Sequence, residues 1–186
     1  MMLIPIILVV TLIAFYSIYA SLIRKKNAVE ESFSGIDVQL TKRHDLIPNV
    51  IETAKKFMTH EKTLMEEITN LRTAAMSTAH GKDMKKSFKT ESELGDKLGQ
   101  LMISVENYPT LKSDSTMLNV QEALESTEEH IAAARRFYNS SVRVLNDFTQ
   151  VWPMSMIAGW IKIKNYPYFE AAEEAKEVPN AGKMFS

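Results

Sequence analysis

The sequence predicts an all-α protein in which an N-terminal transmembrane helix is continuous with an up-and-down four-helix bundle, and a short C-terminal helix follows Pro153. Three observations support this fold class. The first 23 residues contain no charged side chain. Apolar residues then recur every three or four positions through four long stretches, and no stretch alternates with the period of two that a half-buried strand shows. We expect a membrane anchor in residues 1–23, a helical bundle in 19–169 and a loose tail in 170–186.

Composition narrows the class of protein further. The chain has 186 residues, which suggests one domain, and 45% of them are hydrophobic, so a core can form. The formal net charge of −1 argues against nucleic acid as a partner, because such proteins usually carry a basic excess. The absence of cysteine excludes disulfides, zinc ribbons and thiol nucleophiles.

The expected membrane span begins at Leu3 and ends at Ile23. About 20 apolar residues in a helix cross a bilayer core of about 30 Å. A cleaved signal peptide is the alternative, but it needs a basic n-region and small residues before its cleavage site. Here the segment before the apolar run has no Lys or Arg, and Ile18 is a poor partner for a cut after Ala20. We therefore favour a retained anchor.

Three basic residues set the expected orientation, since basic residues that flank a span tend to remain cytoplasmic. They follow the span directly: Arg24, Lys25 and Lys26. The N-terminus should then lie outside the membrane, and the bulk of the chain in the cytoplasm.

Four stretches carry helical periodicity, at about residues 19–44, 48–76, 84–107 and from the loop PTLKSDS to about 148. Gly81 and Asp83 mark the expected stop and restart between the second and third stretches. Three residues of the later loop are candidate N-caps for the fourth stretch: Ser113, Asp114 and Ser115.

The segment RHDLIPN, residues 43–49, admits two interpretations. Leu40, Ile47 and Ala54 are seven residues apart, so the apolar register continues across Pro48 and favours one kinked helix. A single helix from residue 19 to 76 would however be about 85 Å long, and the later stretches would cover only about half of it. Since Pro suits a helix start and disfavours helix just before it, we expect a hairpin at residues 45–48.

Several segments match one family in order and spacing. They are DVQLTKRHDLIPNVIETAKKF, His60-Glu61, ENYPTLKSDSTML, LESTEEHIAAARRFYNSSV and a Trp-Pro pair. Over about residues 19–169 the chain resembles the LemA family. The resemblance implies a bacterial inner-membrane protein with one N-terminal span and an all-α bundle, and the family has no assigned catalytic residues to carry over. Leu145, Trp152 and the C-terminal VPNAGKMFS depart from the family pattern.

A hairpin at Pro48 would bring RHDLIPN and ENYPTLK together at the membrane-distal tip. Arg43 occupies a position that the apolar stripe would fill, and we expect Glu106 to be its partner. These charged and polar side chains either form a recognition surface or satisfy turn backbone and helix ends, which is the more common role. The candidate tip surface comprises Arg43, His44, Asp45, Asn49, Glu106 and Lys112.

A second polar cluster lies in the fourth stretch and comprises Arg135, Tyr138 and Asn139. By residue count it should lie near the membrane end, level with Asn27 of the first stretch and with Asn70 and Arg72 of the second. Buried polar residues in a bundle commonly fix helix register. A ligand site between helices is the alternative.

The pattern for a metal centre or cofactor is missing from the sequence. Di-metal bundles use Glu-x-x-His pairs, and the residues three before the four histidines are Thr41, Phe57, Ser77 and Thr127. We therefore expect no metal and no cofactor. Gly95 and Gly99 more plausibly mark a close helix approach than a cofactor-binding loop.

An apolar segment with two lysines follows the fourth stretch: Trp152, Met154, Met156, Ile157, Trp160, Ile161, Lys162, Ile163 and Lys164. It either caps the lower end of the bundle or touches lipid, because Trp and Lys both suit the membrane interface.

These features together favour a membrane-anchored, non-enzymatic helical scaffold or adaptor that binds protein partners. A small-ligand binder or enzyme with a site near Arg135 and Asn139 is the alternative. An extracytoplasmic stress protein would follow if the orientation were reversed.

Overall fold

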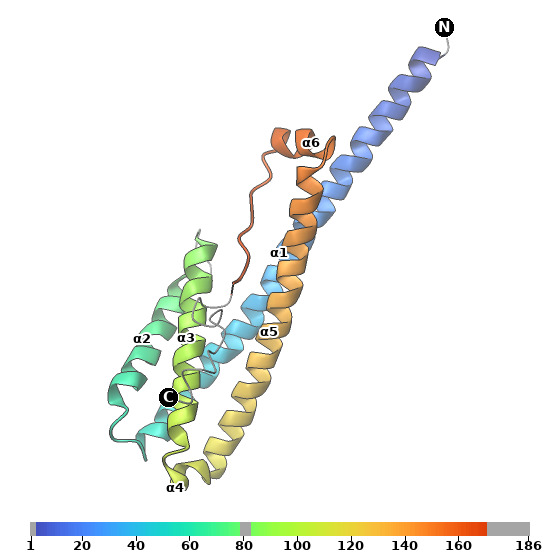
Figure 1. The fold of residues 1–186 in the computed structure, drawn as a ribbon. Helices are drawn as coiled ribbons and strands as arrows, with labels where there is room; N and C mark the ends of the chain where they lie inside the picture. The colour runs from blue at the N-terminus through green and yellow to red at the C-terminus, as the bar shows by residue number, and fades with distance from the viewer. Residues whose placement is uncertain (1–2, 79–82, 171–186) are drawn as a thin grey trace, which may run out of the picture. The chain divides into compact units, whose positions relative to one another are not determined.

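The computed structural model describes residues 3–78 and 83–170, and every regular element within these ranges is a helix (Figure 1). The helices are α1 (Leu3–Lys55), α2 (Lys62–Thr78), α3 (Met84–Val105), α4 (Pro109–Lys112), α5 (Ser115–Gln150) and α6 (Met154–Trp160). The all-α fold class and the short helix after Pro153 are confirmed. Gly81, the expected helix stop, and residues 171–186 of the expected tail lie outside the described residues.

The chain divides into two compact units. Met1–Val38 and Ala132–Tyr168 form the first, which we call the anchor unit. Gln39–Ile131 and Phe169–Ser186 form the second, which we call the bundle unit. One boundary between the units lies within α1, after residue 38, and another lies within α5, after residue 131. Helices α1 and α5 therefore each contribute to both units.

The bundle unit is an up-and-down four-helix bundle built from residues 39–55 of α1, from α2 and α3, and from residues 115–131 of α5. Each segment turns its apolar stripe inward, as the spacing predicts. The core includes Ile47, Val50, Ala54, Met65, Ile68, Leu94, Leu98, Leu101, Leu111, Met117 and Leu124.

Two aspartates begin helices of the bundle unit. The side chain of Asp83 accepts a hydrogen bond from the backbone N–H of Lys86 at the start of α3. Asp114 Oδ1 accepts from the N–H groups of Thr116 and Met117, at 2.9 and 3.1 Å. Both bonds satisfy backbone donors that have no partner within the helix. The predicted restart at Asp83 and one of the three proposed caps of α5 are therefore confirmed.

The hairpin expected at residues 45–48 is wrong. Helix α1 runs without interruption through Pro48 to Lys55, and the chain reverses at residues 56–61 instead. The backbone N–H groups of Lys56 and Phe57 bond to Thr53 and Ala54, three residues back, which tightens the last turn before the reversal. The unbroken apolar register across Pro48 was the correct signal.

A side chain from another helix explains how the proline fits inside α1. Pro48 has no N–H, so the carbonyl of His44, four residues earlier, lacks its usual helical donor. Arg72 of α2 replaces that donor, with its Nε 2.7 Å from the His44 oxygen. The length argument for a hairpin also fails, because only residues 39–55 of α1 pack in the bundle unit, and α2 matches them with 17 residues.

The anchor unit holds the apolar start of α1, the end of α5, α6, a turn at residues 161–162 and an extended segment at residues 163–168. The N-terminal part of α1 is long and apolar enough to cross a membrane, and its side chains are almost all exposed. Two tyrosines hold the extended segment: Tyr166 donates to Glu30 at 2.9 Å, and Tyr138 donates to the carbonyl of Pro167 at 2.8 Å.

Candidate functional site

A buried group of charges lies inside the bundle unit. Arg43 of α1, Glu91 of α3 and the neighbouring His44 are at most 5% exposed. One guanidinium nitrogen of Arg43, Nη2, forms an ion pair with Glu91 Oε2 and donates to the Glu91 carbonyl at 2.9 Å. The other, Nη1, lies 3.0 Å from Glu128 of α5. With the bond from Arg72 to His44, this cluster joins all four helices of the unit.

Glu91 is the centre of this charged cluster. His44 Nε2 lies 3.0 Å from Glu91 Oε1 and 3.3 Å from Oε2. Burial by itself would raise the pKa of Glu91, but the hydrogen bond with His44 and the charges of Arg43 and His44 outweigh burial and hold that pKa below its ordinary value. The carboxylate therefore stays ionised although its side chain has no exposed surface.

Gly95 makes room for the Arg43 guanidinium. A Cβ at this position of α3 would lie 3.1 Å from Arg43 Nη1, whereas a Cβ at Gly99 would meet nothing within 4 Å. The close approach expected for this pair of glycines therefore occurs at Gly95 alone, and it is to an arginine side chain.

The expected tip surface does not form as predicted. Arg43 and His44 are buried inside the bundle, and Arg43 pairs with Glu91 and Glu128, so the expected partnership with Glu106 is wrong. Glu106 instead forms an exposed ion pair with Lys112. The error follows from placing the chain reversal at Pro48 rather than at residues 56–61, since the true turn leaves Arg43 three helical turns inside α1. Asp45 and Asn49 are exposed on α1.

The loop ENYPTLK does meet the chain reversal that the structure shows. Tyr108 donates its hydroxyl to Glu61 Oε2 at 2.7 Å, and Glu61 ends the 56–61 turn. The hydrogen bond to that carboxylate raises the pKa of Tyr108. The turn between α1 and α2 and the loop between α3 and α5 therefore lie at the same end of the bundle unit, as expected. The turn begins after Lys55 rather than at Pro48.

The predicted cluster at Arg135, Tyr138 and Asn139 belongs to the anchor unit, whereas Arg72 belongs to the bundle unit. Arg135 and Asn139 are half-buried and Tyr138 is buried. The Tyr138 ring packs against Phe33, and its hydroxyl donates to Pro167. Burial, followed by the nearby Tyr166, raises the pKa of Tyr138, so its hydroxyl remains a donor.

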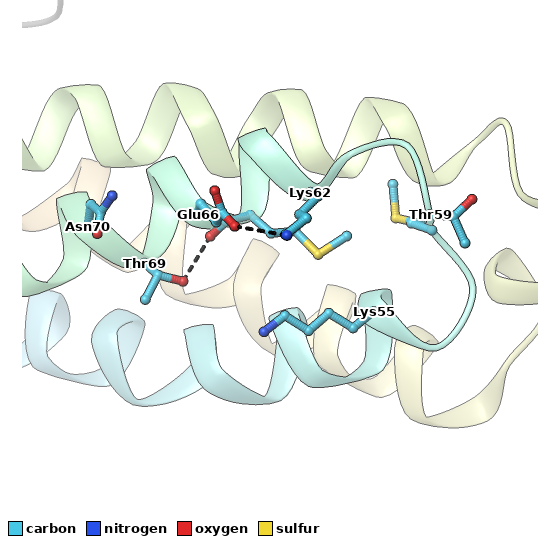
Figure 2. A pocket seen from close by; sticks show the side chains of 8 residues that line it. Lys55, Thr59, Lys62, Glu66, Thr69 and Asn70 are labelled. Atoms are coloured by element: carbon cyan, nitrogen blue, oxygen red, sulfur yellow. Dashed lines mark hydrogen bonds and ion pairs between the residues drawn. The ribbon is translucent and has the colours of Figure 1, made fainter.

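A groove of about 670 Å³ opens between the end of α1 and the start of α2, and it is a candidate binding site. Its buried apolar walls come from Met58 and Met65, which are 3% and 2% exposed. Figure 2 shows the polar rim, with Lys55 on α1 across from side chains of α2. Among these, Lys62 and Glu66 form an ion pair at 3.8 Å. The remaining lining residues are Thr59, Thr69 and Asn70.

Sequence reasoning missed both Glu91 and the groove. Glu91 had a signal: it falls on the apolar stripe of α3, three residues after Phe88 and three before Leu94, just as Arg43 interrupts the stripe of α1. Two opposite charges at core positions of two helices indicate a buried pair. The groove had no such signal, because it depends on where α1 ends. Among the residues that the structure describes, no group of three or more acidic or histidine side chains is arranged to hold a metal ion.

The fold and these sites define a class of all-α proteins in which one helix carries a candidate membrane span and continues into a four-helix bundle with a buried charged centre. The family model that matches this chain is the LemA family, over residues 32–181. The chain belongs to the LemA family.

Individual relatives agree with this assignment. The chain is 22% identical to Protein LemA of Metamycoplasma hominis over 171 residues, which cover 89% of this chain and 76% of that protein. It is also 34% identical over 76 residues to magnetosome protein MamQ 2 of Paramagnetospirillum magneticum. Magnetosome protein MamQ of Magnetospirillum gryphiswaldense is 35% identical over 75 residues.

The matches to the MamQ proteins cover only part of each chain. They span 41% and 40% of this chain and 28% of each MamQ protein. The candidate span and the family assignment together fit a membrane-associated protein.

Proposed function

We propose that this protein is a membrane-anchored, non-enzymatic helical scaffold or adaptor that binds a protein partner in the groove between α1 and α2. One observation carries the proposal: the single helix α1 supplies both the candidate span and one wall of the groove. A partner held by Lys55 and Met58 would thus be linked to the membrane through continuous helix.

The proposed location is the bacterial cell inner membrane, crossed once, with the N-terminus outside and the bundle unit in the cytoplasm. The apolar side chains that begin α1 are exposed, as lipid contact requires. Arg24, Lys25 and Lys26 follow the span and favour a cytoplasmic position for what comes next.

The groove suggests the chemistry of the partner. Methionine adapts its shape to irregular apolar surfaces, and Met58 and Met65 form the walls. Glu66 is the one acidic residue among those that line the groove, and it pairs with Lys62 rather than with Lys55. An amphipathic helix with an apolar face and an acidic edge would complement this surface, as helices bound in grooves commonly do.

The buried charges support a non-enzymatic role. A catalytic carboxylate needs access to its substrate, whereas the carboxylate of Glu91 is enclosed and already bound by Arg43 and His44. These groups fix the arrangement of the helices rather than face the groove.

Site-specific photocrosslinking in bacterial cells tests the proposal. A photoreactive residue at Thr59 or Asn70 should give defined protein adducts that mass spectrometry identifies. Lys55→Glu with Lys62→Glu should reduce the adduct yield about tenfold, which corresponds to about 1.4 kcal/mol of binding free energy. Lys85→Glu with Lys89→Glu, at two exposed positions of α3, is the matched charge control and should leave the yield unchanged. Adducts that respond equally to both substitutions, or no adducts at all, would contradict groove binding.

A further inference from the structure

The end of α5 and the helix α6 lie at different levels along α1 within the anchor unit. The Lys25 ammonium is 5.0 Å from the centre of the Phe148 ring, so α5 ends beside the basic residues that follow the span. The Trp160 ring of α6 meets the Phe15 ring edge-on, with centres 6.2 Å apart. Phe15 precedes Lys25 by ten residues, which is about 15 Å along the helix toward the membrane.

The chain between these two contacts is apolar and exposed. On one side α6 buries Ile157 and Ala158. Large apolar groups of α6 and of the residues just before it are uncovered, and their exposed fractions are Val151 58%, Trp152 74%, Met156 67% and Trp160 77%. Contiguous exposed apolar surface of this kind marks a contact with a protein or a membrane.

The position of α6 is fixed from both ends. Helix α5 brings the chain to the level of Lys25. After α6 a turn at residues 161–162 leads into the segment 163–168, in which Tyr166 donates its hydrogen bond to Glu30 of α1. Lys162 lies in this turn and Lys164 in this segment.

We infer that residues 151–160, which we call the α6 segment, form a second membrane contact and insert into the leaflet at the basic end of the span. The inference rests on the proposed membrane anchor. Lipid is the occupant because the contact of Trp160 with Phe15 places the segment beside the span, on the membrane side of its basic flank, where it adjoins the exposed apolar surface of α1. Trp and Met on one side and Lys residues just after suit the boundary between headgroups and acyl chains.

The two tryptophans of the sequence, Trp152 and Trp160, both lie in the α6 segment, so intrinsic Trp fluorescence reports on it alone. The full chain is reconstituted into vesicles of phosphatidylethanolamine and phosphatidylglycerol. Co-flotation with the vesicles first tests the anchor independently. Vesicles with brominated acyl chains should then reduce the Trp emission about twofold, and acrylamide in the water should quench it weakly, as expected for side chains about 5–10 Å below the headgroups.

A repositioned tryptophan provides the control. Trp152→Phe and Trp160→Phe remove both reporters, and Phe137→Trp places one on the exposed side of α5, eleven residues before Phe148. Position 137 lies about 16 Å from Phe148 and Lys25 along α5, on the side away from the membrane. The emission of this Trp should therefore respond to acrylamide and not to brominated lipid.

Two results would overturn the inference. Native Trp emission that acrylamide quenches as strongly as the control shows that the α6 segment faces water. Emission that neither quencher reaches shows that protein, including a second copy of this chain, covers the segment. In both cases co-flotation would still show whether the proposed anchor holds.

Discussion

Arg72 and Pro48 act on the same atom, the carbonyl oxygen of His44. The proline removes the helical donor for that oxygen, and the arginine side chain supplies another from α2. The proline therefore fits inside α1 without leaving a buried carbonyl unsatisfied, and it opens a position where α2 docks by a specific hydrogen bond.

We predict that Arg72→Ala lowers the free energy of unfolding by about 1–3 kcal/mol, because the His44 oxygen loses its donor. In a Pro48→Ala background the new N–H at position 48 can bond to that oxygen, so the same substitution should cost less. Circular dichroism of the full chain in detergent micelles, with denaturant, measures the four stabilities of this double-mutant cycle. Additive effects would show that the two residues do not share the carbonyl.

Gly95 and Gly99 provide a matched pair on α3. We expect Gly95→Ala to destabilise the protein by about 1 kcal/mol or more, since its Cβ would lie 3.1 Å from an Arg43 nitrogen that Glu91 and Glu128 hold in place. Gly99→Ala meets nothing and should stabilise α3 by about 0.5–1 kcal/mol. Thermal unfolding of both variants measures the difference, and equal melting temperatures would contradict it.

The lowered pKa of Glu91 predicts a loss of stability in acid. A carboxylate whose pKa is lower in the folded state contributes stability that is present above its unfolded pKa, about 4.3, and that is lost as the pH falls through the folded value. The free energy of unfolding should therefore decline below about pH 4.3. Unfolding between pH 7 and pH 3 measures this decline.

Substitution of Glu91 separates its contribution from that of other carboxylates. Glu91→Gln should flatten the acid decline and should cost about 3–5 kcal/mol at pH 7, because it leaves the Arg43 charge buried with less compensation. Glu93→Gln, at an exposed position of the same helix, should keep the decline of the unsubstituted protein. An unchanged slope in Glu91→Gln would assign the acid sensitivity elsewhere.

At the scale of elements, two tyrosine hydroxyls hold the extended segment that follows the turn at residues 161–162. Burial and then the hydrogen bond to Glu30 raise the pKa of Tyr166 to about 12, and burial raises that of Tyr138, so both hydroxyls remain protonated donors. The Lys26 ammonium and then Tyr166 lower the pKa of Glu30, which keeps the acceptor ionised.

We predict that Tyr138→Phe loosens this segment, since Pro167 loses its hydrogen-bond donor at a cost of about 0.5–1.5 kcal/mol. Limited proteolysis with mass spectrometry should then find faster cleavage within residues 161–168. Tyr168→Phe, at a half-exposed position, is the control and should be cleaved at the original rate. Equal rates for the two variants would contradict this role of Tyr138.

Helix limits could be predicted where a local signal marks them. Asp83 and Asp114 cap α3 and α5 as their sequence positions indicate, because capping depends only on neighbouring residues. The end of α1 was misplaced because Pro48 is a stronger local signal than anything in residues 56–61. What overrides it is a contact with α2, and sequence order does not reveal that contact.

At the scale of the whole molecule, the proposed orientation gives a direct prediction. The sequence has no cysteine, so single introduced thiols report their own location. Leu3→Cys, at the outer end of the proposed span, should react with a membrane-impermeant maleimide in intact spheroplasts, and Lys89→Cys on α3 should react only after permeabilisation. The reverse labelling pattern would contradict the cytoplasmic location of the bundle unit.

By itself the sequence determined the all-α class, the LemA family, the candidate span and the segments that become α3 and α5, since these depend on periodicity and local composition. Only the tertiary structure shows that α1 continues through Pro48 and that Arg43 is buried. A proline inside a helix leaves the carbonyl four residues earlier without its donor, and this cost falls when another group donates to that carbonyl. A charged side chain is costly to bury unless an opposite charge is buried with it. Arg72 and Glu91 supply that donor and that partner from other helices.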